Sequence, residues 1–260
     1  MSFGLMEKGA LRRKIVAGER TVGTFVGLAS TFAAEVCAAT NPDWILIDLE
    51  HGSCDEGQVG SLALAAAAYG VPSIVRVESP ERIRIGRVLD QGVAGVMIPR
   101  IETVEQVRSA LQHLRYPPYG DRGVATYNRS ARWGLDPSSL TAEEQETLFI
   151  VQIETLAALD AVDEIVAIDG VDLLFIGPLD LSFALGVPRQ FDHPTFLKAL
   201  DRVQEAAERA GKPVGILASD KTAGKALAKR GIHFIGVGSD STLLSAAMKD
   251  ALAVVREAKN

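Results

Sequence analysis

The sequence lacks several features that would place the protein in a specialised class. Its 260 residues include only two cysteines, Cys37 and Cys54, too few for a disulfide framework or a thiolate zinc site. The longest apolar run, LALAAAAYGV, falls short of the ~20 residues a membrane helix needs, and the start has no apolar signal core. The net charge is -6, which argues against nucleic acid or an anionic membrane as partner. We therefore expect a cytoplasmic protein with reduced thiols.

Apolar, β-branched runs alternate with helical patterns along the whole chain. The runs typical of strands cover 21–28, 43–49, 72–77, 94–99, 148–153, 171–176, 213–217 and 232–237. The helical patterns cover 31–40, 55–69, 80–91, 102–113, 155–168, 194–210, 220–230 and 241–257. Runs that are apolar throughout indicate parallel strands buried on both faces. With no break in composition, the chain is predicted to form one domain over 1–260, a (β/α)8 TIM barrel. A doubly wound open sheet stays possible, since counting strands cannot prove closure.

Residues 114–146 interrupt this alternation. They are long, irregular and rich in Pro, Tyr and Arg. Loops of this length in compact α/β domains are usually functional or disordered, and the aromatic residues favour order. The segment is predicted to be a lid or a subunit contact, with a solvated connector as the alternative.

Carboxylates follow two successive apolar runs of strand length. Glu154 ends LFIVQIE and Asp180 ends DLLFIGPLD. The carboxyl ends of parallel strands meet at one rim, where ligands bind. Two carboxylates there repel each other unless a cation, a proton or an arginine lies between them. The sequence therefore predicts a divalent metal at Glu154 and Asp180, held through oxygen as Mg²⁺ is.

Two neighbouring features can hold the same ligand. Gln152 lies two residues before Glu154 in a predicted strand, so its side chain points to the same face. The GPLD stretch at 177–180 predicts a tight turn, whose backbone N–H groups at Leu179 and Asp180 can hold a carboxylate.

An earlier run, WILIDLEH, brings further polar residues to the rim. His51 is a candidate general acid or base, or else a polar loop histidine. Asp48 and Glu50 are candidates for residues that contact a metal-bound water or that hydrogen-bond to the metal ligands. Arg76 lies in SIVRV and needs a partner if buried, so it is an anion clamp or a structural ion pair. Asp90 can pair with His51 or Arg76, or it is a polar residue at a helix end.

Lysine is missing from the ends of the strand candidates. Lys212 precedes its strand, and Lys221 lies in a loop that looks solvated. Enolate chemistry through a Schiff base needs a lysine near the catalytic rim, so a route through a metal is favoured.

Taken in order, these residues resemble the HpcH/HpaI aldolase family, metal-dependent class II pyruvate aldolases typified by 4-hydroxy-2-oxoheptanedioate aldolase. The matching stretches are DWILIDLEH, PSIVRV, RVLDQGVAGVMIPRIETVEQ, RYPPYGDRG, RSARWG, VQIET, GVDLLFIGPLDLS, GILA and FIGVGSDSTLL. The resemblance implies a barrel of the phosphoenolpyruvate/pyruvate-domain type with Mg²⁺, Mn²⁺ or Co²⁺. It implies an aldehyde-lyase that cleaves a 4-hydroxy-2-oxo acid to pyruvate and an aldehyde through a metal-stabilised enolate. It also implies a homo-oligomer, a hexamer built as a trimer of dimers, with the C-terminal helix exchanged between subunits.

The resemblance also implies roles for single residues. The metal ligands would be Glu154 and Asp180, the acid/base His51 supported by Asp90, the enolate-stabilising residue Arg76, and the pyruvate-holding groups Gln152 and the backbone at Leu179 and Asp180. Phe25 and Leu179 depart from the family pattern, so the acceptor aldehyde stays open.

Three other functions stay open. One is a CoA-thioester β-hydroxyacid lyase of the same superfamily, against which DLEH weighs because that group tends toward DLED. Another is oxaloacetate decarboxylation, which passes through the same enolate. The third is a binding protein that keeps the barrel and a metal without catalysis.

Overall fold

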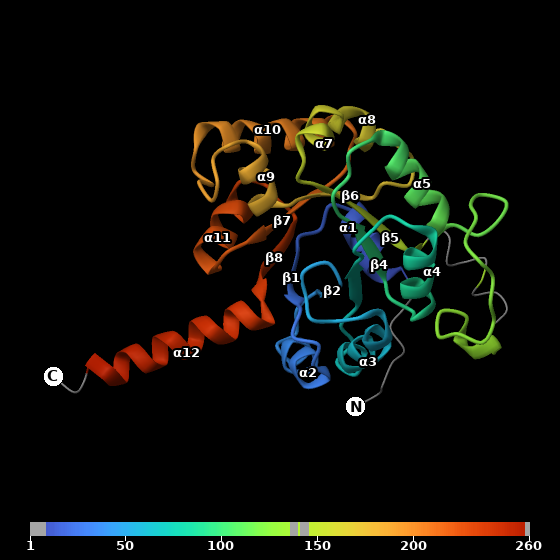
Figure 1. Cartoon of the computed structure of the whole chain (residues 1–260), viewed down its shortest axis with the longest axis horizontal. Helices are drawn as coiled ribbons and strands as arrows, with labels where there is room; N and C mark the ends of the chain where they lie inside the picture. Colours follow the sequence, from blue (N-terminus) through green and yellow to red (C-terminus); the bar gives the residue numbers. More distant parts are fainter. Residues whose placement is uncertain (1–8, 136–139, 141–145, 258–260) are drawn as a thin grey trace.

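Eight parallel strands form a closed barrel in a computed structural model that describes residues 9–135, 140 and 146–257. The strands are β1 (Thr21–Val26), β2 (Trp44–Asp48), β3 (Ser73–Arg76), β4 (Gly95–Ile98), β5 (Leu148–Ile153), β6 (Leu173–Ile176), β7 (Val214–Ala218) and β8 (Phe234–Ser239). Each strand pairs with the next in the chain, and β8 pairs with β1 (Figure 1). The predicted (β/α)8 barrel is confirmed, and the open sheet is excluded.

Helices surround the barrel, with two exceptions. The helices are α1 (Ala10–Val16), α2 (Thr31–Ala39), α3 (Glu56–Ala67), α4 (Arg82–Asp90), α5 (Val104–Leu114), α7 (Leu156–Asp160), α8 (Val162–Val166), α9 (Pro178–Ala184), α10 (Pro194–Arg209), α11 (Lys221–Lys229) and α12 (Asp240–Glu257), with a 3₁₀ helix η1 (Arg132–Gly134). The exceptions are α1, which packs on the interior core, and α12, which projects away (Figure 1). No helix in the described part of the chain has both the length and the apolar character needed to cross a membrane.

Two apolar cores hold the barrel together. One lies between the strands and the helices, and the other fills the barrel interior. Inside, the rings of Trp44 and Phe234 stack with centroids 4.2 Å apart, and Phe175 meets Phe234 edge-on. A side chain at Gly23 would collide with Trp44, so this strand position requires glycine. The interior is thus a packed core and not a pore, so a ligand site has to form at the ends of the strands.

Three local elements differ from the prediction. The helix expected over 155–168 is two short helices, because Ala161 between them leaves helical dihedral angles. The GPLD stretch is the first turn of α9, with Gly177 as its N-cap and Pro178 at its first position, where proline is favoured. The helix α1 was not predicted. Its Leu11 and Ile15 join the interior core, and its Arg12 pairs with Asp172 just before β6.

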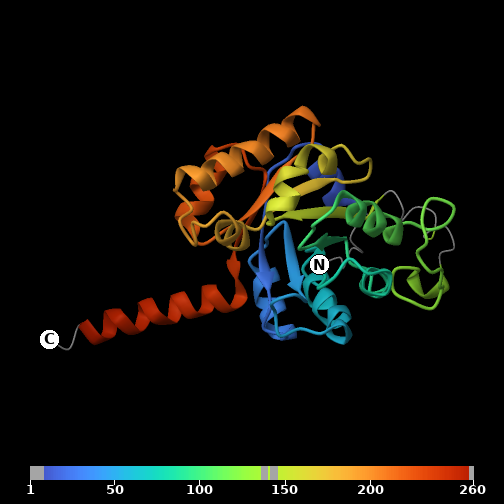
Figure 2. The ribbon, with the colours of Figure 1, turned by 45° about the horizontal axis from the view of Figure 1, so that its top comes forward.

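The last helix stands apart from the barrel. In Figures 1 and 2, α12 projects away from the barrel beyond the end of β8. Every described residue after Asp240 in this helix is exposed, including Leu244, Met248 and Val255. A helix over 241–257 is therefore confirmed, while its exchange between subunits stays a prediction.

The segment predicted over 114–146 lies partly outside the described residues. Its described portion is irregular, with η1 and a cis peptide bond between Pro117 and Pro118. Tyr119, Tyr127 and Trp133 on it are exposed, while Tyr116 is buried. Its role as a lid or a subunit contact stays a prediction.

Candidate active site

Arg76 and two carboxylates form a buried ion cluster at one end of the barrel. The residue is the last of β3 and pairs in register with Asp48, the last of β2. Its Nε lies 2.8 Å from Asp48 Oδ1 and its Nη2 lies 2.7 Å from Oδ2, a bidentate pair. Its Nη1 lies 3.1 Å from Glu50 Oε2. The ion pair considered from sequence is therefore formed, and it leaves part of the guanidinium available, since arginine has five N–H donors.

The charge of Arg76 is well supported although the side chain is only 7% exposed. Burial opposes the charge, but the hydrogen bond and charge of Asp48, together with Glu50 and Glu154, outweigh it and raise the pKa of Arg76. The guanidinium also lies over the Phe25 ring, 5.4 Å from its centroid. Arg76 is therefore a fixed positive charge in a low-dielectric site.

Glu154 follows β5 and is 2% exposed. Its Oε1 accepts a hydrogen bond from the Arg100 backbone N–H at 2.7 Å, and its Oε2 accepts one from Gln152 Nε2. Burial raises the pKa of Glu154, the Arg100 hydrogen bond lowers it, and the charges of Glu50 and Asp180 raise it further. A side chain at Gly177 would collide with Glu154 and Gln152, so the residue before α9 has to be glycine. The carboxylates of Glu50 and Asp180 therefore lie near enough to Glu154 for their charges to interact, and the sequence predicted this proximity for Glu154 and Asp180.

Arg100 touches both predicted metal ligands. Its backbone N–H holds Glu154, and its Nη1 lies 4.0 Å from Asp180 Oδ1 in the first turn of α9. Its φ of 50° is a left-handed conformation that non-glycine residues seldom adopt, which often marks a functional site. Sequence reasoning missed Arg100, although it lies two residues after the end of β4, a position similar to the one that drew attention to Glu154 after β5.

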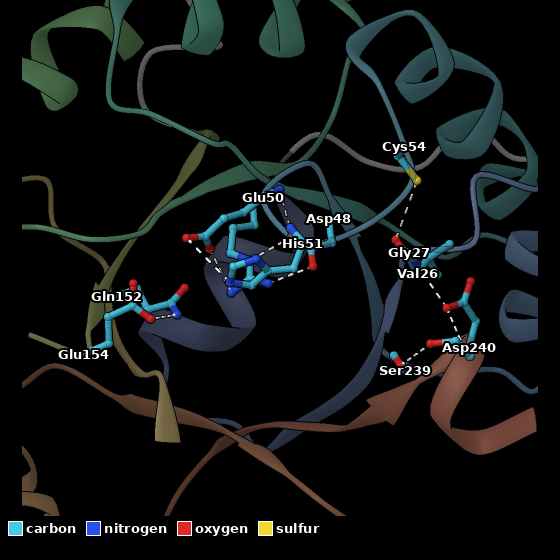
Figure 3. A network of polar contacts seen from close by, with 12 residues as sticks. Val26, Gly27, Asp48, Glu50, His51, Cys54, Gln152, Glu154, Ser239 and Asp240 are labelled. Atoms are coloured by element: carbon cyan, nitrogen blue, oxygen red, sulfur yellow. Dashed lines mark hydrogen bonds and ion pairs between the residues drawn. The ribbon is translucent and has the colours of Figure 1, made fainter. Parts of the chain in front are cut away.

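His51 lies at the open edge of this group. Its side chain is 63% exposed, and its Nε2 is 3.9 Å from Glu50 Oε1. Its backbone N–H donates to Asp48 Oδ1 at 3.4 Å, and that of Glu50 donates to the same oxygen at 3.1 Å. Figure 3 shows Asp48, Glu50 and His51 on one loop, separate from Gln152 and Glu154. An exposed imidazole held at its backbone can exchange protons with a ligand and with water.

The pairing of Asp90 with His51 or Arg76 is not formed within the described chain. The Asp90 carboxylate accepts a hydrogen bond from Arg122 Nη2 at 3.0 Å, and its backbone oxygen accepts one from Ser130. Asp90 ends α4 and therefore contacts the irregular segment that follows α5 instead of the rim. Leu179 is half exposed in the first turn of α9, where the first backbone N–H groups of a helix lack intrahelical partners.

The donors at Glu154 and Asp180 fit a hard divalent cation. Among the described residues, no three His, Cys, Asp or Glu side chains form a complete metal cage. Mg²⁺-type ions do not need one, because they take one or two carboxylates and complete the shell with waters and substrate oxygens. The buried Gln152 Oε1 has no hydrogen-bond partner in the part of the chain that the structure describes. An unsatisfied acceptor beside the carboxylates suits a site that is completed by water or a ligand.

Comparison with known proteins decides the family. The family model described as HpcH/HpaI aldolase/citrate lyase matches residues 21–247. The chain belongs to this family. A pyruvate aldolase of Rhizobium etli is 37% identical, over 90% of this chain and 92% of that protein. A hydroxypyruvate/pyruvate aldolase of Deinococcus radiodurans is 36% identical, over 95% of this chain and 89% of that protein. The crystal structure of a family member from Burkholderia cenocepacia J2315 superposes with a TM-score of 0.91 at 36% identity, covering 95% of this chain and 99% of that one. The resemblance seen in the motifs is confirmed.

Proposed function

We propose that the protein is a metal-dependent aldolase that cleaves a 4-hydroxy-2-oxo acid to pyruvate and an aldehyde, and catalyses the reverse addition. One observation carries the proposal: Arg100 contacts Glu154 through its backbone N–H and Asp180 through its guanidinium, and the buried Glu154 carboxylate interacts with the charges of Asp180 and Arg76. Similarity to proteins named pyruvate aldolase supports the reaction type.

The metal site consists of Glu154 and Asp180 in this proposal. When bound there, Mg²⁺, Mn²⁺ or Co²⁺ supplies Lewis-acid polarisation of the 2-oxo group. Gln152 can hold the pyruvate end of the substrate through its free acceptor by way of a water. The backbone N–H groups of Leu179 and Asp180 take the substrate carboxylate.

Arg76 and His51 divide the remaining work. Arg76 faces the oxygen where negative charge develops as the carbon–carbon bond breaks, so its remaining donors act mainly in the transition state. Asp48 and Glu50 keep the guanidinium oriented. His51 takes the proton of the substrate's 4-hydroxyl group, directly or through one water, which its exposure at the rim permits.

We also propose that the whole chain is a single domain that assembles by exchange of α12. An isolated helix with Leu244, Met248, Leu252 and Val255 exposed along it cannot bury that surface in its own subunit. Exposed Phe32 on α2 is an apolar contact site on the barrel for a partner's helix. A hexamer built as a trimer of dimers satisfies this exchange. The two unpaired cysteines support a cytoplasmic location.

The test follows pyruvate release from a panel of 4-hydroxy-2-oxo acids, first after chelation and then after Mg²⁺ or Mn²⁺ is restored. We expect release only with metal, and no restoration in Glu154→Gln. Glu105→Gln, on the exposed face of α5, is the matched control and should behave as the wild type. Release of pyruvate by fully chelated enzyme, or by Glu154→Gln at the wild-type rate, would refute the metal assignment.

A further inference from the structure

A buried carboxylate outside the ion cluster has no role in the reaction described above. Asp240 is 6% exposed at the junction of β8 and α12. Burial of a charge is costly unless it is paired or hydrogen-bonded. No cation pairs with Asp240 within the described residues. Three backbone N–H groups hold it instead, at 3.1 Å from Gly27, 3.0 Å from Leu28 and 2.8 Å from Ser241.

Capping of α12 does not explain this arrangement. Ser239 and Thr242 already form reciprocal bonds at the start of the helix, from Thr242 N–H to Ser239 Oγ and from Ser239 N–H to Thr242 Oγ1. The Asp240 oxygens reach across to the loop that follows β1, as Figure 3 shows. This carboxylate is therefore placed to hold that loop.

The loop held by Asp240 contacts the loop that contains His51, which connects β2 to α3. The Gly27 carbonyl accepts a hydrogen bond from Ser53 N–H at 2.7 Å. Gly27 and Gly52 pass so closely that a Cβ on Gly27 would lie 3.3 Å from Gly52 Cα. Ala29, two residues after Gly27, has a φ of 55°, a strained conformation that persists only where its surroundings fix it. The His51 loop is thus held by Gly27 at Ser53 and by Asp48 at Glu50 and His51.

We propose that Asp240 is a positioning residue for His51, which it fixes through the Gly27–Leu28 backbone and the Ser53 hydrogen bond. The inference rests on the proposed function, in which His51 moves a proton. The link spans two loops and joins the base of α12 to the acid/base residue. An error of about 1 Å in the place of such a group costs up to about a hundred-fold in rate.

The experiment compares Asp240→Asn with Asp250→Asn, a matched change on the exposed face of the same helix. Asparagine keeps the shape but turns an N–H₂ group toward at least one of the three backbone donors. We expect kcat for aldol cleavage to fall about 10- to 100-fold in Asp240→Asn, with KM and proton exchange at pyruvate C3 within about two-fold of the wild type. Asp250→Asn should match the wild type. Unchanged cleavage, equal loss in both assays, or loss that merely follows dissociation of the assembly would overturn the inference.

A second variant and a second readout make the test independent of folding and of activity. Gly27→Ala keeps Asp240 but crowds Gly52, so it should reproduce the same split between cleavage and exchange if Asp240→Asn does not fold. Amide hydrogen exchange of residues 51–54 should quicken in both variants while residues 99–103 stay unchanged. Unaltered exchange at 51–54 would refute the link even in a protein that cleaves no substrate. Absence of pyruvate release from the wild type would count against the proposed function alone.

Discussion

Replacement of Arg76 by lysine separates a catalytic role from a purely structural one. The change keeps the positive charge but removes the planar fork that holds both oxygens of Asp48, at 2.8 and 2.7 Å. The lysine ammonium can reach one carboxylate at a time and has no planar surface to lie over Phe25. Its charge also shifts within a site in which position decides the strength of electrostatic stabilisation.

The structure sets different magnitudes for the two roles. Loss of one charge-assisted hydrogen bond to Asp48 costs about 1.5–3 kcal/mol of folding stability, since the remaining charge still compensates the carboxylates. Removal of the charge altogether, as in Arg76→Met, would cost about 3–5 kcal/mol because Asp48 and Glu50 would be buried without a partner. Loss of one preorganised donor in the transition state costs about 2.7–4 kcal/mol, a fall in kcat of about 10²–10³-fold.

The assay measures kcat and KM for aldol cleavage with saturating Mn²⁺, beside urea unfolding of the same samples. We expect kcat of Arg76→Lys to fall at least about 100-fold while KM changes little. Arg108→Lys, an exposed change on α5, is the matched control. If kcat stays within two-fold of the wild type while stability drops, Arg76 is a structural ion pair and the assigned role is wrong.

Three further changes test other parts of the site. His51→Ala should impair aldol cleavage more than proton exchange at pyruvate C3, because water can reach the rim where His51 lies; NMR of deuterium uptake measures the second activity. In metal-free protein, burial raises the pKa of Glu154 and of Glu50 above 4.5, so the folded state binds protons more tightly than the unfolded state. Stability should therefore fall as pH rises through and above 4.5, less steeply in Glu154→Gln, as chemical unfolding across pH will show. Arg100→Met should tighten Mn²⁺ binding up to about five-fold in calorimetry, since an exposed pair 4.0 Å from Asp180 contributes at most about 1 kcal/mol.

Each of these predictions has its contrary outcome. Equal loss of cleavage and of exchange in His51→Ala would contradict the division of proton transfers. A pH dependence in Glu154→Gln as steep as in the wild type would show that other groups account for the loss of stability. Weaker or unchanged Mn²⁺ binding in Arg100→Met, with Arg108→Met as control, would show that the guanidinium does not compete with the metal.

The fold could be predicted because alternation of apolar runs and helices is a local property of the sequence. The gathering of Glu154, Asp180 and Arg76 could also be predicted, since parallel strands bring their carboxyl ends to one rim. The partner of Asp90 could not. Which carboxylate meets Arg122 depends on the path of an irregular segment whose conformation no periodicity encodes.

Hydrogen bonds made by backbone atoms are the larger gap. Neither the bond from Arg100 to Glu154 nor the bonds from Gly27 and Leu28 to Asp240 depend on the donor's side chain. A sequence pattern therefore carries no record of them. Only the acceptors, Glu154 and Asp240, can be recognised in the sequence, because each is a carboxylate directly after a strand, β5 or β8. Asp240 could have drawn the same attention as Glu154, because a charge that follows a buried strand needs a partner. The role inferred for it depends on the close passage of Gly27 and Gly52, which only the three-dimensional structure supplies.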